Sequence, residues 1–331
     1  MKVLKCCRNY EQFVDYICRI IGIYDMCHYD WMLIANTMEW YCFEGDNKMG
    51  RKIAWITDTA SFVSPEFIKK HNIHVLPLNM VFEDESFRET VDMTHEEFYQ
   101  KLRDAKVHPK TSQPKLGEHV ALYEKLKEEG YDCAIAVHVS SKQSGTVDSA
   151  PMAAEQAGFK TYAIDSRIGS YPMQRMLELG MELEKQGVEE EQIVSEIEAL
   201  RDKAQLAFLP ASLEQLHKSG RVSGLAMMIS QLLNIKLVIA YNKEGVCEVV
   251  HKVRAEKRAK KMITDLLDEA LAISQIDEVA VINCNNLAGA NVWISELKQS
   301  YPTIHFVPTE LSAAVGVHAG EGTLGLTWVR G

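Results

Sequence analysis

The chain has 331 residues, which is enough for two domains, since one hydrophobic core rarely grows much past ~250–300 residues. Its net charge of −10 argues against binding to nucleic acid, which needs a basic surface. No apolar run approaches the ~20 residues that span a bilayer, and no secretory signal pattern is seen, so we expect a cytoplasmic protein.

Residues 1–48 differ in composition from the rest and hold five of the eight cysteines. Three interpretations are open for this atypical N-terminal extension. It is upstream sequence translated from a misplaced start codon ahead of Met49, a helix that binds a partner or a membrane surface, or an extra structural element. We favour the first and assign no function to the segment.

From residue 52 the pattern alternates between strand and helix. Such alternation predicts a parallel α/β sheet, with ligands beyond the carboxyl ends of its strands. The predicted strands are 52–58, 74–82, 132–140 and 160–165, and the predicted helices are 64–71, 94–102, 115–129 and 147–158.

The second half mixes these patterns with a hairpin at 236–254, which predicts a mixed sheet. Further helices are expected at 172–185, 188–203, 213–218, 225–233, 256–272 and 287–299, and further strands at 205–210, 278–284, 303–308, 316–319 and 323–328. We therefore expect two domains, 49–210 and 211–331, with the boundary between 165 and 210.

Four short polar segments lie at chain turns and offer hydroxyls, backbone N–H groups, a guanidinium and an imidazole. The clearest is 140–146, between an apolar strand and a helix, where the Ser144 hydroxyl, Gly145 and the helix N-terminus could hold an anion. An ordinary N-cap needs only one Ser or Thr, and this loop has three Ser, a Gly and a Thr.

The other segments are less specific alone. Thr111 and Ser112 precede Pro114 in an ordinary helix-start pattern. Arg221 follows a helix-ending glycine. His318, expected at the end of a strand, precedes two glycines that indicate close backbone approach. Asp58 and Asp165, at strand ends, are secondary candidates. We find no cysteine and histidine spacing for zinc and expect no metal and no cofactor.

In this order, the segments resemble the DegV family of fatty-acid-binding proteins, which serve bacterial fatty acid kinases. The likeness covers about residues 52–328, and only the ordered set is specific. It implies a two-domain α/β protein with a parallel α/β N-terminal domain, a mixed-sheet C-terminal domain and a long-chain fatty acid between them. The protein would be a carrier without catalysis of its own. Its ligand would be the fatty acid, and its partners an ATP-dependent kinase subunit and, transiently, a membrane or acyltransferase.

The resemblance also implies roles for residues. Thr111 and Ser144 would hold the carboxylate, with Ser141 as an alternative to Ser144, and Arg221 and His318 would support phosphorylation to an acyl-phosphate for phospholipid synthesis. The chain departs from the family pattern at Glu321 and Leu237, where the family usually has proline, and at Ser219, often glycine there. A carboxylate at position 321 near a bound carboxylate is unfavourable unless it faces solvent or pairs with a base.

Two other functions compete with the carrier. Ser144 with His318 could form a serine esterase, although no GxSxG elbow is present. A small-metabolite binder or phosphotransferase related to dihydroxyacetone kinases would instead use His318 to hold a carbonyl. The apolar stretch with Met227, Met228 and Leu232 could line an acyl tunnel or pack in an ordinary core.

Overall fold

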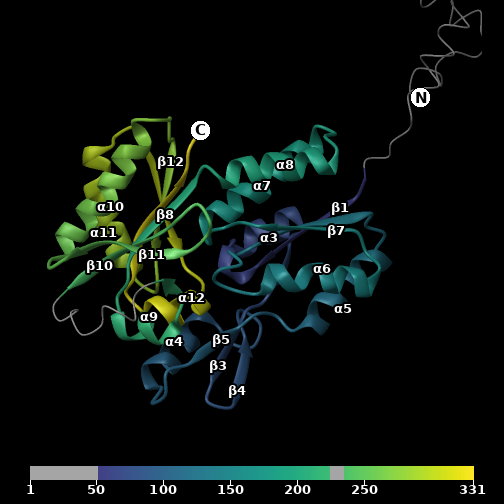
Figure 1. Cartoon of the computed structure of the whole chain (residues 1–331), viewed down its shortest axis with the longest axis horizontal. Coiled ribbons are helices and arrows are strands. Elements are labelled where there is room, and N and C mark those ends of the chain that lie inside the picture. The colour runs from purple at the N-terminus through teal and green to yellow at the C-terminus, as the bar shows by residue number, and fades with distance from the viewer. Residues whose placement is uncertain (1–50, 224–234) are drawn as a thin grey trace, which may run out of the picture. The chain divides into compact units, whose positions relative to one another are not determined.

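The computed structural model describes residues 51–223 and 235–331, which belong to one compact unit, Arg51–Gly331 (Figure 1). The proposed extension 1–48 lies outside the described residues, as does the predicted helix 225–233 with Met227, Met228 and Leu232. None of the helices within the described ranges is long and apolar enough to cross a membrane.

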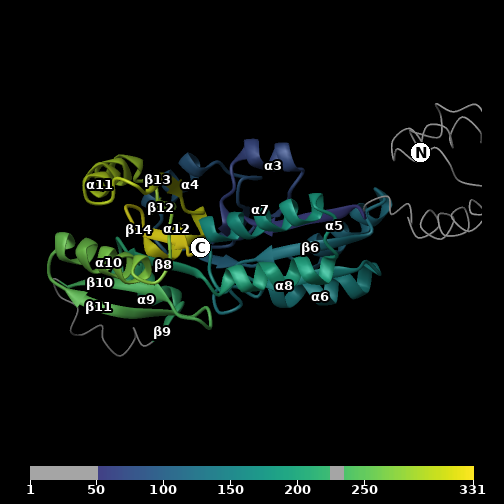
Figure 2. The same ribbon diagram turned by 90° about the horizontal axis from the view of Figure 1, so that it is seen from above.

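A four-stranded parallel sheet forms the first layer, with strand order β2-β1-β6-β7. Helices cover both of its faces, and Figure 2 shows them on either side of β1 and β6. This confirms the predicted parallel sheet. Its strands are β1 (Ile53–Asp58), β2 (His74–Leu76), β6 (Cys133–His138) and β7 (Thr161–Asp165). Its helices are η1 (Thr59–Ser61), α3 (Pro65–His71), α5 (Leu116–Glu128), α6 (Thr146–Ala157), α7 (Tyr171–Lys185) and α8 (Glu190–Arg201).

Strands β1 and β6 are buried along their whole length because both faces of the sheet are covered. Alternate residues enter different cores. Trp55 packs in the core that includes residues of α7 and α8, whereas Ile56 packs in the core that includes residues of α5 and α6. This period of two explains why both strands are nearly continuous apolar runs in the sequence.

A seven-stranded mixed sheet forms the second large layer, with strand order β13-β12-β14-β8-β10-β11-β9. The predicted hairpin is confirmed as the antiparallel pair β10 and β11. Its strands are β8 (Ala204–Leu209), β9 (Val222–Ser223), β10 (Lys236–Tyr241), β11 (Cys247–Val253), β12 (Glu278–Asn283), β13 (His305–Glu310) and β14 (Leu324–Val329). The accompanying helices are α9 (Leu213–Ser219), α10 (Glu256–Leu271), α11 (Leu287–Ser300) and α12 (Ala313–Ala319).

The two faces of this sheet belong to different cores. On β8, Ala207 and Leu209 pack in the core shared with α10 and α11. Leu206 and Phe208, on the opposite face, join the core that also holds residues of β1, β6 and α7. The second face of the mixed sheet is therefore packed with the first layer and not exposed to water.

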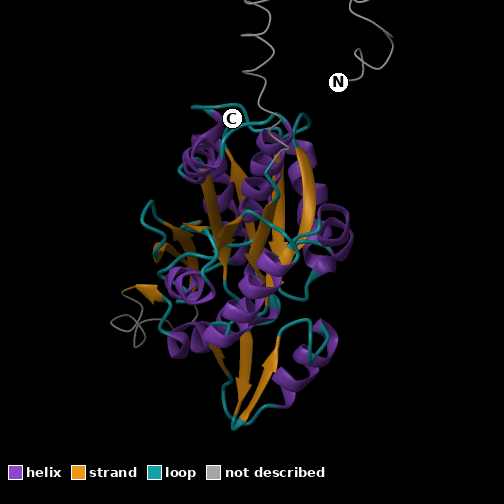
Figure 3. Cartoon of the chain, turned by 90° about the vertical axis from the view of Figure 1, so that its right-hand side faces the viewer, coloured by secondary structure: helices purple, strands orange, loops and turns teal. Residues whose placement is uncertain are grey.

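A third, three-stranded antiparallel sheet was not predicted. Its order is β4-β3-β5, and Figure 3 shows it below the two large sheets. It consists of β3 (Asn79–Phe82), β4 (Glu85–Arg88) and β5 (Lys110–Ser112), with α4 (His95–Asp104) beside it. Thr111 therefore lies on a strand, and the next helix begins at Leu116.

Two predictions of secondary structure were wrong. The single strand 74–82 is two strands, β2 and β3, in different sheets, because Pro77 cannot donate a backbone hydrogen bond at the point of separation. The predicted strand 316–319 is the end of helix α12, whose first turn is capped by the Ser312 hydroxyl. The predicted domain boundary at 165–210 stays a prediction.

The β10–β11 turn packs tightly against the first layer. The Ser140 hydroxyl donates to the Gly245 carbonyl over 2.8 Å. A Cβ atom on Gly245 would lie 2.4 Å from Ser140 Oγ and 2.9 Å from Arg167 Cα, and the residue has φ +81. Only glycine fits this contact without strain.

We predict that Gly245→Ala lowers the free energy of unfolding by about 2–4 kcal/mol, from the left-handed backbone and from overpacking. Urea unfolding measures the change. Gly117→Ala is the matched control, because a Cβ there meets nothing within 4 Å and Gly117 lies in helix α5. Equal stability of the two variants would contradict the proposed close contact.

Candidate functional site

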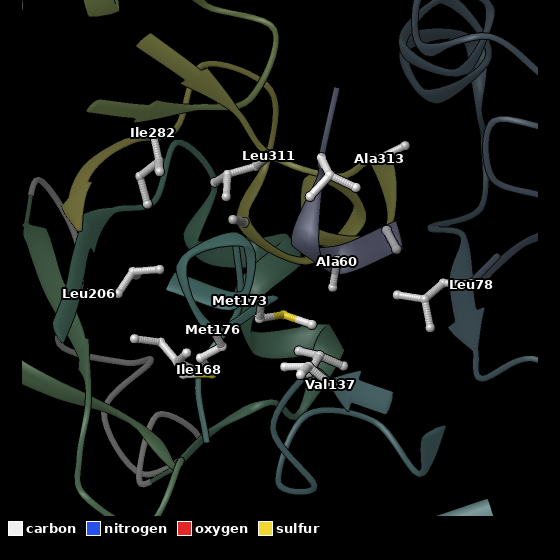
Figure 4. Close-up of a cluster of buried hydrophobic side chains, with 14 of the residues drawn as sticks. Ala60, Leu78, Val137, Ile168, Met173, Met176, Leu206, Ile282, Leu311 and Ala313 are labelled. Carbon is white, nitrogen blue, oxygen red and sulfur yellow. The ribbon is translucent and has the colours of Figure 1, made fainter. Parts of the chain in front are cut away.

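A cavity of about 310 Å³ lies between the layers. Most of its wall is apolar, with contributions from the mixed sheet, from the segments that follow β1 and β6, and from α12. Figure 4 shows Ala60, Leu78, Leu206, Ile282 and Leu311, which belong to this wall, in the surrounding cluster of buried side chains. Its polar side chains come from separate segments of the chain, namely Thr111, Ser112, Gln113, Gln143, Ser144, Ser170, Arg221, Tyr241 and His318.

Ser144 and Gly145 bring the N-terminus of α6 to the cavity wall. Gly145 is the N-cap residue, and no side chain caps this helix end. The Ser144 hydroxyl lies 2.8 Å from the Thr146 hydroxyl, so one of the two can donate to the other. The uncapped N–H groups carry the positive end of the helix dipole, which favours an anion here.

Thr111 and His318 meet although they lie 207 positions apart. Thr111 Oγ1 is 2.8 Å from His318 Nε2. The contact joins strand β5 to the last turn of helix α12. His318 Nδ1 is buried and has no hydrogen-bond partner among the described residues. The imidazole therefore has one polar atom available for further bonding.

Burial, together with the nearby charges of Arg221 and His108, lowers the pKa of His318 to about 3. At neutral pH the ring is therefore neutral. An anion bound beside it would favour the protonated form and raise this pKa. The site can consequently take up a proton together with an acidic ligand.

Arg221 supplies the permanent positive charge of the cavity wall. It follows Gly220, the C-cap of α9, which has φ 65 as predicted for a left-handed helix end. Arg221 Nη1 donates to the Ser219 carbonyl over 2.7 Å, and Gln143 Nε2 donates to the Arg221 carbonyl over 3.3 Å. The guanidinium has five N–H donors, so others remain for a carboxylate or a phosphoryl group.

Helix α12 is held in place at two points. The buried carboxylate of Glu89 accepts from the Ser312 hydroxyl at 3.2 Å and from the Ala313 backbone N–H at the helix start. Further along, a Cβ atom on Gly316 would lie 2.6 Å from the Tyr99 hydroxyl. These contacts fix the helix that carries His318.

The structure brings together Thr111, Ser112, Ser144, Gly145, Arg221 and His318, which all line the cavity. The other predicted residues do not line it. Asp165 Oδ1 accepts the Ser141 and Arg167 backbone N–H groups. Asp58 is fully buried and accepts from Ala60 N at 3.0 Å and Val139 N at 2.9 Å.

Two departures from the family pattern also have a defined place. Glu321 forms an ion pair with Arg103 at 2.6 Å and accepts from Asn285 Nδ2 at 2.6 Å. It does not line the cavity. Leu237 is fully buried in strand β10. The carboxylate of Glu321 is thus paired with the guanidinium of Arg103. This pairing meets the condition under which a carboxylate at position 321 is compatible with an anion bound nearby.

Sequence reasoning missed Glu89 and Ser170. Glu89 lies in an acidic segment that looks solvated, and its burial follows only from the three-stranded sheet and α12. Ser170 precedes the first residue of α7 and belongs to no binding motif. Neither residue has a local sequence signal.

The geometry does not support a serine hydrolase. Ser144 bonds to Thr146 and His318 bonds to Thr111, and no hydrogen bond between Ser144 and His318 occurs within the described ranges. His318 Nδ1 also lacks the carboxylate that would orient the ring as a base.

Together, the fold and the cavity define an α/β binding protein with a largely apolar pocket that has a polar, anion-compatible side. The family model described as an uncharacterised protein of the DegV family matches residues 52–331. The chain belongs to the DegV family, as its sequence predicted.

Relatives with solved structures share the fold. Protein DegV of Bacillus subtilis is 34% identical over 278 residues, covering 83% of this chain and 98% of that protein. The crystal structure of DegV from Bacillus subtilis, titled a fatty acid binding protein, matches with a TM-score of 0.77 and 33% identity, over 85% of this chain and 100% of that chain. A fatty acid binding DegV family protein from Streptococcus agalactiae matches with a TM-score of 0.79 and 26% identity, over 85% of this chain and 99% of that chain.

The depressed pKa of His318 gives a prediction for stability. An unfolded chain protonates this histidine as the pH falls through its ordinary 6.5, whereas the folded protein does so only near 3. Stability is therefore lost as the pH falls from 6.5, by about 2 kcal/mol at pH 5 for this one group. Urea unfolding at several pH values should show a shallower acid loss for His318→Gln. Parallel curves for the two proteins would contradict a neutral, buried His318.

Proposed function

We propose that this protein binds a long-chain fatty acid in the cavity and presents its carboxylate to an ATP-dependent fatty acid kinase. The kinase transfers the γ-phosphoryl group of ATP to a carboxylate oxygen and releases ADP. The carrier then delivers the acyl-phosphate to phospholipid synthesis in the cytoplasm, through transient contact with a membrane or an acyltransferase. The carrier catalyses no reaction by itself, and Arg221 and His318 support the phosphoryl transfer that the kinase performs.

The observation that carries this proposal is the pairing of an apolar cavity with an anion-compatible side. A buried carboxylate costs several kcal/mol unless it is paired and hydrogen-bonded. The Thr111 and Ser144 hydroxyls, the N-terminus of α6 and the Arg221 guanidinium together provide that compensation. The relatives whose titles name fatty acid binding support the same ligand class.

The rest of the cavity suits an alkyl chain. Its wall includes Leu78, Val139, Phe208 and Leu311, whose apolar side chains can pack against the methylene groups of the chain. Each buried CH₂ contributes ~0.8 kcal/mol, or about fourfold in affinity. The acyl chain therefore supplies most of the binding free energy, and the polar side fixes the orientation.

The carboxylate assignment predicts the effect of removing both hydroxyls. Thr111→Val together with Ser144→Ala should weaken stearate binding roughly 100-fold or more, because hydrogen bonds to a charged group are worth ~1.5–3 kcal/mol each. Isothermal titration calorimetry on the delipidated full chain measures the loss.

Ser141→Ala is the matched control, since Ser141 does not line the cavity although it belongs to the same loop. It should bind stearate as the unmodified protein does. The single variant Ser144→Ala is measured beside it. Loss of binding in Ser141→Ala with no loss in Ser144→Ala would show that Ser141, and not Ser144, contacts the carboxylate.

Arg221 is proposed to act on the phosphoryl group more than on the acid. Arg221→Ala should reduce acyl-phosphate formation at least tenfold, assayed with a fatty acid kinase subunit of the same organism and radiolabelled ATP. It should change stearate affinity much less, because the two hydroxyls and α6 remain. Arg258→Ala, an exposed arginine of α10, is the control. Equal losses in both steps would refute a role specific to phosphoryl transfer.

A further inference from the structure

Ser170 is a wall residue of the cavity with an unusual backbone. It lies between Gly169 and the first residue of α7 and is only 1% exposed. Its φ is 64 and its ψ is −146, a conformation found almost only at glycine. A serine here is strained, and glycine would remove the strain.

The serine side chain has no structural partner that would explain it. Serine is favoured at helix N-caps because its hydroxyl accepts a backbone N–H, yet at Ser170 no side-chain cap bond forms. Ser170 Oγ is buried without any hydrogen-bond partner in the described part of the chain. The backbone N–H, by contrast, donates to the Ala60 carbonyl over 2.8 Å.

Two costs therefore coincide at one residue of the cavity wall. A left-handed backbone at a residue with a Cβ costs stability, and so does a buried hydroxyl without a partner. Alanine would remove the second cost and glycine both. Strain of this kind persists where a residue serves a ligand, and a hydroxyl in a cavity wall can be satisfied by what the cavity holds.

Most of the residues that line the cavity together with Ser170 are apolar. A Cβ atom on neighbouring Gly169 would lie 3.6 Å from Val139 Cγ2 and 3.9 Å from the Tyr241 hydroxyl. The Tyr241 hydroxyl interacts with Cys247, and both residues line the cavity. Ser170 belongs to neither carboxylate-binding segment, because Thr111 lies on β5 and Ser144 precedes α6.

We propose that the Ser170 hydroxyl is a hydrogen-bonding point inside the acyl cavity for a fatty acid that carries a hydroxyl group along its chain. This inference rests on the proposed function and specifies its ligand class. A hydroxylated chain and Ser170 satisfy each other, so neither polar group is buried alone. A plain alkyl chain fits the same cavity but leaves Ser170 Oγ unpaired.

The test compares stearate with a set of hydroxystearates that carry the hydroxyl at successive carbons. Each is titrated by calorimetry into the delipidated full chain, Ser170→Ala and Ser170→Gly. Both variants lack the hydroxyl, but only Ser170→Gly also relieves the backbone strain. A change in affinity that the two variants share is therefore due to loss of the hydroxyl. Circular dichroism and stearate binding establish that each variant folds.

We expect at least one hydroxystearate to bind the unmodified protein at least as tightly as stearate. Both variants should lose roughly fivefold to tenfold in affinity for that isomer, the value of one neutral hydrogen bond, and keep their affinity for stearate. A crystal structure of that complex should show the ligand hydroxyl within hydrogen-bonding distance of Ser170 Oγ.

Three results would overturn the inference. If every hydroxystearate binds far more weakly than stearate to all three proteins, the cavity has no polar point for the chain. If the variants lose stearate and hydroxystearate affinity equally, Ser170 contacts the carboxylate or stabilises the cavity wall, and does not recognise a hydroxyl on the chain. If both variants keep full affinity for every isomer, Ser170 contacts no ligand. Failure of the unmodified protein to bind either class would instead refute the proposed function.

Discussion

The buried carboxylate of Glu89 is the contact on which the cavity depends. It accepts from the Thr59 hydroxyl at 2.6 Å and from Ser312 at 3.2 Å. Burial raises its pKa, and the hydrogen bonds from Thr59 and Ala313 oppose that rise. One side chain thus joins the turn after β1, the small sheet and the start of α12. The Leu311 backbone N–H, which donates to the Asn283 carbonyl over 2.7 Å, ties the same helix start to β12.

Much of the fold could be predicted because its signals are local. Strands β1 and β6 are continuous apolar runs, and the hairpin of β10 and β11 surrounds a turn sequence at Asn242–Gly245. The three-stranded sheet gave no such signal, since Glu85–Arg88 is short and mostly exposed. Helix α12 was misread because Val315 and Val317 favour strands, and packing against Tyr99 and Glu89 overrides that preference.

The candidate site was predictable as a set of residue types but not as an arrangement. Each turn contained hydroxyls, a guanidinium or an imidazole, and the family resemblance assigned them one ligand. The pairing of Thr111 with His318 depends on β5, a strand that local propensity did not predict. The neutral state of His318 depends on burial by distant segments, and the strain at Ser170 depends on a backbone that no sequence motif specifies.

Native mass spectrometry of the full chain purified from a bacterial host, followed by lipid extraction, shows whether the cavity holds a fatty acid. We expect one tightly held fatty acid per chain, released only on denaturation. A chain that is isolated empty, and that takes up no stearate when the acid is added, would contradict the claim that the cavity is a fatty acid site.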